Sequence, residues 1–200
     1  MTVRLHRNAH RPTHACITSS IELACLREPE TYEYIFHDEI AAQAGGLAFY
    51  VTYENRDDRT VTPGKRPNLK PDRAFGIRNL KEETTRYYLL EVDRGTETLA
   101  TDNSTRKSLL DNDLQYRQFI GGLEYKEALD YAGGIVLLNL MTSPARMRNL
   151  MRLIRPSNYM AFKAMPQFAP TVEFTVPAPM PELLTEAWER PGREPFYINK

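Results

Sequence analysis

The feature that most constrains the fold is a continuous apolar run, "GGIVLLNLM", at residues 133–141. Such a run is typical of a strand buried on both faces, at the centre of a sheet that helices cover on both sides. The next segment, "SPARMRNLMRLIR", predicts a helix with Ser143 as its N-cap and Pro144 at its first position. Its apolar stripe consists of Met147, Leu150, Met151 and Ile154.

The other segments are assigned by hydrophobic period and by turn residues. Helical spacing predicts helices in "HACITSSIELACLRE" and in "STRKSLLDNDLQYRQFI". Alternation and β-branched or aromatic residues predict strands in "YEYIFHDEI" and "LAFYVTYE", and a hairpin from "RAFGIR" to "RYYLLEV". The polar, proline-containing "NRDDRTVTPGKRPNLKP" predicts a loop, and Gly and Pro break the chain into short pieces after the last helix. This order predicts a mixed α/β domain with a small central sheet flanked by helices.

The chain has 200 residues, of which 42% are hydrophobic and 26% charged, so we expect one folded domain with a sizeable core. We assign residues 1–12 to a basic arm and 13–200 to the domain, with the tail around Trp188 packing back on it. No apolar run approaches the ~20 residues of a membrane span, and no secretory signal is visible, so we expect a cytoplasmic protein without a membrane partner. The formal net charge is zero, so any nucleic-acid contact must depend on local basic patches.

Three acids surround the predicted hairpin: Asp72 follows Pro71, and Glu91 and Asp93 end the second strand. Side chains alternate along a strand, so Glu91 and Asp93 point to one face, and a neighbouring strand that begins at Asp72 brings its carboxylate beside them. Such hard oxygen ligands suit Mg²⁺ or Mn²⁺. The alternative is that Asp72 and Asp93 are ordinary turn residues.

Longer stretches in this order resemble the replication-relaxation family of plasmids and other mobile elements, over about residues 13–196. The segments that carry the resemblance are "HDEI", "LKPDRAFGI", "YYLLEVDRGTE", "STRKSLLDNDLQYRQFI", "IVLLNLMTSPARMRNLMRL" and "WERPGREPF". Within them, "PD" followed by "ExD" resembles the PD-(D/E)xK nuclease signature.

The resemblance implies a PD-(D/E)xK-like α-β-β-β-α-β core with Asp72 and Glu91 as metal ligands, and with Glu39 or Glu22 as a possible extra acid. Asp93 occupies the position of the nuclease lysine and becomes an added ligand or a group that orients water.

The second helix of the family carries a lysine four residues before a tyrosine. Here Tyr116 is present, but Asn112 occupies the lysine position. Lys107 is then a candidate for a migrated catalytic lysine.

Arginines supply the candidate DNA contacts. Arg94 follows the acids directly; on a strand it points away from them, and it can pair with a phosphate or with a surface acid. Arg148, Arg152 and Arg155 are spaced along one face of the last predicted helix, opposite its apolar stripe. That face can follow a phosphate backbone, or it can simply be solvated.

The sequence therefore predicts a DNA-associated protein of a plasmid or other mobile element, with a metal-dependent endonuclease as the leading activity. The alternative is an inactive nuclease fold that binds DNA or acts as a regulatory or interaction module with replication or mobilisation proteins. The absence of a lysine at the nuclease position favours the alternative. The presence of all three acids, Asp72, Glu91 and Asp93, favours the nuclease.

Overall fold

The computed structural model describes residues 10–51, 53–54, 61–62, 69–95, 99, 108–169 and 178–200. Its α-helices are α1 (His10–Arg27), α2 (His37–Gln43), α3 (Leu109–Gly121), α4 (Tyr125–Ala128) and α5 (Pro144–Leu153), and its short 3₁₀ helices are η1 (Pro166–Phe168) and η2 (Pro181–Leu184). Its strands are β1 (Tyr32–Ile35), β2 (Tyr53–Glu54), β3 (Val61–Thr62), β4 (Arg73–Asn79), β5 (Thr84–Asp93), β6 (Gly134–Met141), β7 (Met160–Ala164), β8 (Trp188–Arg190) and β9 (Arg193–Phe196).

Within these residues, seven strands form one mixed sheet in the order β1-β4-β5-β6-β7-β8-β9. The first three strands are antiparallel neighbours, and β5, β6 and β7 are parallel to one another. A parallel pair needs a crossover, which α3 and α4 provide between β5 and β6 and α5 provides between β6 and β7. The carboxyl ends of β5, β6 and β7 therefore meet at one edge of the sheet.

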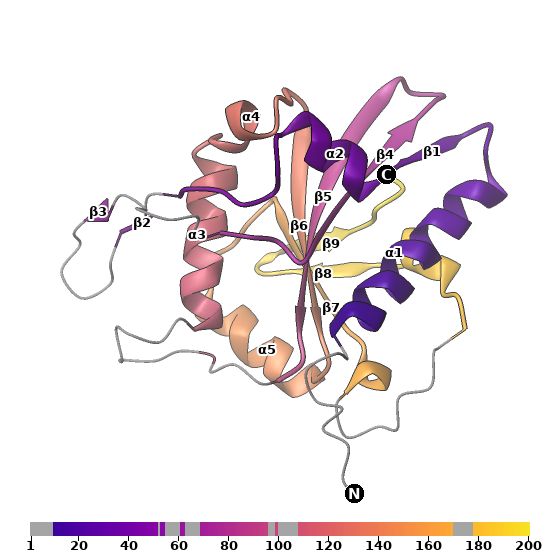
Figure 1. Cartoon of the computed structure of the whole chain (residues 1–200). Helices are drawn as coiled ribbons and strands as arrows, with labels where there is room; N and C mark the ends of the chain where they lie inside the picture. Colours follow the sequence, from indigo (N-terminus) through magenta and orange to yellow (C-terminus); the bar gives the residue numbers. More distant parts are fainter. Residues whose placement is uncertain are drawn as a thin grey trace, which may run out of the picture.

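Helices cover both faces of the sheet, and two apolar clusters fill the space between them (Figure 1). On one face, α2, α3, α4 and α5 pack against alternate residues of the central strands, such as Leu89 and Leu137. On the other face, α1, η1, η2 and the C-terminal strands pack against the intervening residues, such as Leu90 and Leu138. Trp188 is fully buried in this second cluster. The continuous apolar run of β6 is therefore explained by burial on both faces.

The predicted mixed α/β class is confirmed, while several boundaries differ. The predicted strand over residues 32–40 is too long, because β1 ends at Ile35 and α2 begins at His37. The Phe36 amide donates to the Glu39 carboxylate at 3.0 Å, a capping contact that favours a helix start there. The predicted strand over residues 47–54 is found only in part. Phe49 forms an isolated bridge with Leu69, and among the described residues of this segment only Tyr53 and Glu54 form a strand, β2.

The sheet is larger than expected, since β7, β8 and β9 extend it beyond β6. Ser143 caps α5 as predicted, accepting from the Arg146 amide, and Ser108 caps α3. No helix within the described ranges is both long and apolar enough to cross a membrane.

Candidate functional site

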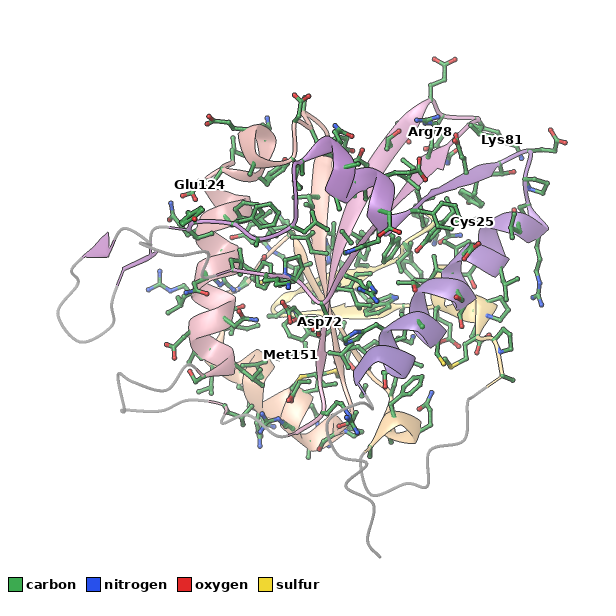
Figure 2. The ribbon with its side chains drawn as sticks, in the orientation of Figure 1. Cys25, Asp72, Arg78, Lys81, Glu124 and Met151 are labelled. Atoms are coloured by element: carbon green, nitrogen blue, oxygen red, sulfur yellow. The ribbon has the colours of Figure 1, made fainter. Side chains whose placement is uncertain are left out.

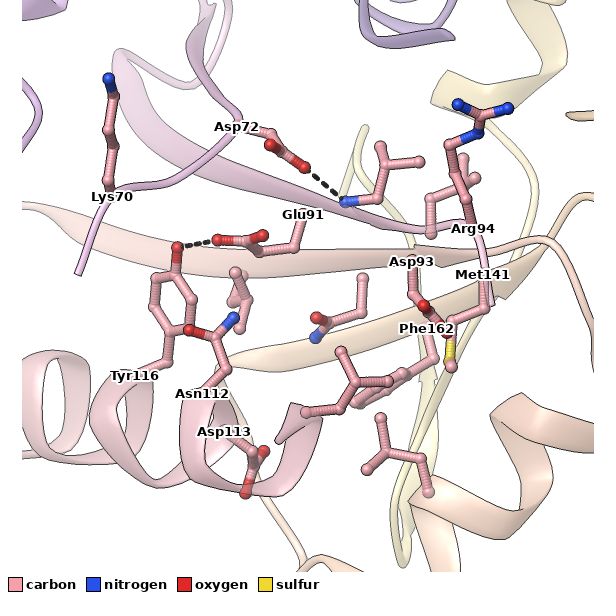
Figure 3. Close-up of a pocket in the computed structure, with 16 residues that line it drawn as sticks. Lys70, Asp72, Glu91, Asp93, Arg94, Asn112, Asp113, Tyr116, Met141 and Phe162 are labelled. Carbon is pink, nitrogen blue, oxygen red and sulfur yellow. Dashed lines mark hydrogen bonds between the residues drawn. The ribbon is translucent and has the colours of Figure 1, made fainter. Parts of the chain in front are cut away.

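A cavity of about 270 Å³ lies at the carboxyl ends of β5 and β6, where α3 and α5 cover the sheet. Polar side chains from the segment before β4, from β5, from β6 and from α3 surround it (Figure 3). The described polar residues that line it are Lys70, Asp72, Glu91, Asp93, Arg94, Asn112, Asp113, Tyr116 and Asn139. Crevices at the carboxyl ends of parallel strands are common ligand sites in α/β proteins.

Asp72 enters the cavity from the residue before β4. Arg73 pairs with Leu90, so the antiparallel ladder places Asp72 beside the end of β5. The Asp72 Oδ2 accepts a hydrogen bond from the Val92 amide at 2.9 Å, and the Nε2 of buried His14 on α1 lies 3.3 Å from it. The Asp72 side chain remains 30% exposed, so the carboxylate is oriented by the backbone and still faces the cavity.

Glu91 lies next to Asp72 and is held by a phenol from α3. The Tyr116 hydroxyl donates a short hydrogen bond to Glu91 Oε1 (Figure 3). Tyr116 is fully buried, and its burial together with the charge of Glu91 raises the pKa of the phenol well above its ordinary value. Tyr116 is therefore a neutral donor that orients Glu91.

Asp93 shares the sheet face of Glu91, as the alternation predicted, but it is held by a cation. Arg146, on the first turn of α5, pairs with Asp93 through Nε, and its Nη2 lies 3.4 Å from the other carboxylate oxygen. The Asp93 side chain is only 7% exposed. Its Oδ1 also accepts from the Gly95 amide at 2.9 Å, and Gly95 has a φ of 79°, a conformation that glycine adopts without strain. Asp93 thus combines the turn role with an ion pair that joins β5 to α5.

Two amides complete the polar lining. Asn139 lies opposite Glu91 in the parallel register of β5 and β6, and Asn112 projects from α3 one turn before Tyr116. The structure therefore brings Asn112 and Tyr116, the two α3 positions that the sequence singled out, to one cavity with Asp72 and Glu91.

Two of the predicted metal-binding residues, Glu39 and Glu22, are not among the described residues that line this cavity. Glu39 is exposed on the first turn of α2, where its carboxylate caps the helix, and it is not among the described lining residues. Glu22 on α1 borders a different groove, near Cys25 and Tyr34. Lys107 lies outside the described residues.

The predicted DNA-contacting arginines occupy three settings. Arg94 borders the cavity, but its guanidinium points to the opposite side of β5 from Asp93 (Figure 3). Arg148 and Arg152 are exposed on α5, opposite its buried Met147 and Leu150. Arg155 is also exposed but follows the end of α5 at Leu153, so its predicted place on the helix face is wrong.

Residues that the sequence reasoning missed are His14, Lys70, Asn139 and Arg146. Only Lys70 had a local signal, since it alternates with the buried Leu69 and shares a side of the chain with Asp72. Comparisons of the chain with protein-family models, with curated proteins and with solved structures found no match.

Proposed function

We propose that this chain is a DNA-associated protein that hydrolyses phosphodiester bonds with Mg²⁺ or Mn²⁺ held by Asp72 and Glu91. The observation that carries the proposal is the convergence of these two carboxylates, one from the residue before β4 and one from β5, on one polar cavity. Two acids brought together in a partly buried site are costly unless a cation or a proton compensates them.

The residues of the cavity fit a hard divalent cation. Mg²⁺ is commonly held by one or two carboxylates, with water and substrate phosphate completing its octahedron. Asp72 and Glu91 supply the carboxylates, and Asn112 and Asn139 supply neutral amide oxygens nearby. Among the described residues, no group of three His, Cys, Asp or Glu side chains could hold a metal ion, so the proposed site relies on two carboxylates, with water and phosphate as the remaining ligands. A bound divalent cation would lower the pKa of a coordinated water and neutralise charge on a phosphate.

The order of elements supports the resemblance to replication-relaxation proteins. The segments α1, β1, β4, β5, α3 and β6 follow the α-β-β-β-α-β order of a PD-(D/E)xK-like core, with α2, β2 and β3 inserted between β1 and β4. In this interpretation Asp72 and Glu91 take the positions of the family's metal ligands, and the mobile-element setting follows from the resemblance alone.

A second candidate function is favoured by the Asp93–Arg146 pair. The chain has an acid where the nuclease signature has a lysine, and that acid is engaged by α5. A fold that kept its carboxylates for structure and lost its chemistry would act as a DNA-binding or regulatory module, or as an interaction subunit with replication or mobilisation proteins. The two candidate functions differ in whether divalent cations bind and whether DNA is cut.

The test uses amide variants that keep the hydrogen bonds of the site. Asp72→Asn retains an acceptor for the Val92 amide, and Glu91→Gln retains one for Tyr116, so each removes charge with little change in shape. Cleavage of supercoiled, linear and single-stranded DNA is followed with Mg²⁺ or Mn²⁺. We expect each variant to lose at least about 100-fold in rate, since a metal contributes several kcal/mol to charge stabilisation.

Glu127→Gln is the matched control, because Glu127 is an exposed acid on α4 away from the cavity. It should cleave like the parent. A parent that cuts none of these DNAs, yet binds DNA with strong salt dependence, would reject the nuclease and support the second candidate.

A further inference from the structure

Carboxylates from several elements line the cavity, and two of them pair with arginines. Four described carboxylates line it: Asp72, Glu91, Asp93 and Asp113. Asp93 pairs with Arg146, and Asp113 pairs with the Arg117 Nε at 2.9 Å, both in largely buried settings. These two arginines are therefore committed to local carboxylates, and neither lines the described cavity.

Two cationic residues, Lys70 and Arg94, are among the described residues that line the cavity. Arg94 directs its guanidinium to the other side of β5 (Figure 3). Lys70 is exposed, and its ammonium has no ion pair or hydrogen bond within the described part of the chain. Among the described residues that line the cavity, Lys70 is thus the cation that is available to an incoming anion.

The backbone of Lys70 is held in place by the residues on either side of it. Leu69 is fully buried and exchanges two backbone hydrogen bonds with Phe49, at 2.8 and 3.2 Å. Pro71 is buried as well and restricts its own φ and the conformation of Lys70. Alternation then places Lys70 and Asp72 on the same side of this extended segment, away from Leu69 and Pro71.

We propose that Lys70 is the cationic group that binds the scissile phosphate beside Asp72 and Glu91. The inference rests on the proposed function and assigns its missing positive group. Hydrolysis of a phosphodiester adds negative charge to the phosphate oxygens as water attacks and the sugar oxygen leaves. The two carboxylates would hold a divalent cation, which would supply positive charge to the phosphate, and the exposed side chain of Lys70 at the rim would add a second positive charge. Lys70 would then supply the positive group from the segment that precedes β4.

Lys70→Met tests this, because methionine keeps an unbranched apolar stem without the charge. Lys70→Arg retains a cation, and Lys81→Met removes an exposed lysine from the β4–β5 turn, at the other end of these two strands from the cavity (Figure 2). Three quantities are measured for each: the cleavage rate in Mg²⁺, the Mn²⁺ affinity by calorimetry, and the affinity for a short DNA duplex in Ca²⁺ across a salt series.

For Lys70→Met we expect cleavage to fall about 100-fold or more and the slope of log K against log salt to decrease by about 0.9, one phosphate contact. The Mn²⁺ affinity should stay within about twofold of the parent. Lys70→Arg should recover most of the DNA affinity, and Lys81→Met should match the parent throughout.

Unchanged DNA affinity and salt slope in Lys70→Met would overturn the assignment of Lys70, whether or not the parent cleaves DNA. Failure of the proposed function has a different signature, namely a parent that neither binds Mn²⁺ nor cuts DNA.

Discussion

The Asp93–Arg146 pair yields the sharpest quantitative prediction. If Asp93 holds α5 to the end of β5, removing either charge should destabilise the fold strongly and removing both should cost little more. The variants are Asp93→Asn, which retains an acceptor for the Gly95 amide, and Arg146→Met, which retains the apolar stem. The same double-mutant cycle on Arg78 and Glu33 serves as the control.

The magnitude follows from burial. The side chains of Arg146 and Asp93 are 17% and 7% exposed. Opposite charges about 4 Å apart attract by about 4 kcal/mol at an effective dielectric constant of about 20. Removing one partner of a buried pair leaves a poorly solvated charge and typically costs about 3–5 kcal/mol. We therefore expect each single substitution to lower the free energy of unfolding by about 3 kcal/mol, with a coupling of at least about 2 kcal/mol.

The charged atoms of the control pair, Arg78 and Glu33, are close together, but their side chains are largely exposed to water. Arg78 Nη1 lies 2.7 Å from Glu33 Oε2, yet the two side chains are 48% and 49% exposed. Its coupling should stay below about 1 kcal/mol, because water screens the charges. The cycles are measured by urea unfolding monitored by circular dichroism. The structural role would be refuted if the two substitutions lowered the free energy of unfolding additively, or if each lowered it by less than about 1 kcal/mol. Asp93 would then again be a candidate metal ligand.

Three further predictions concern individual side chains. Tyr116→Phe removes the donor to Glu91 and should weaken Mn²⁺ binding about 10–100-fold in calorimetry, whereas unchanged affinity would remove Tyr116 from the site. Replacing Arg148 and Arg152 together by Gln should lower the salt slope of DNA binding by about 1.8, and an unchanged slope would show that α5 does not contact phosphate. Burial raises the pKa of Tyr88 to about 12 from 10, so its contribution to stability should be lost between pH 10 and 12. Melting curves of Tyr88→Phe should show a smaller alkaline loss than the parent, and an equal loss would contradict this.

The sequence predicts those helices and strands whose pattern or capping residues lie within the segment itself. The apolar run of β6, the Ser143–Pro144 start of α5 and the alternation of β5 each depend on nearby residues alone, and the structure has all three. The shared face of Glu91 and Asp93 follows from the same alternation.

Elements that depend on distant partners could not be predicted in this way. The strand β7 is a short apolar run between Pro156 and Pro166, and only its pairing with β6 identifies it. Similarly, α2 begins where an alternating pattern seemed to continue, and the His37 Nδ1 that accepts from the Ala74 amide at 3.0 Å ties it to β4.

The partners of the three acids illustrate the same limit. His14, Tyr116 and Arg146 reach Asp72, Glu91 and Asp93 from three different helices. Sequence spacing places the acids near one another, but only packing decides which side chain approaches each of them. Packing places Asp93 in an ion pair with Arg146 of α5. Asp72 and Glu91 are the two acids proposed to hold a metal.

The most direct test of the proposed site is Mn²⁺ binding by calorimetry. The parent, Asp93→Asn and the double variant Asp72→Asn with Glu91→Gln are titrated under the same conditions. If Asp72 and Glu91 hold the cation, the parent and Asp93→Asn bind Mn²⁺ and the double variant does not. Absence of binding to the parent, or equal binding by the double variant, would contradict the metal site.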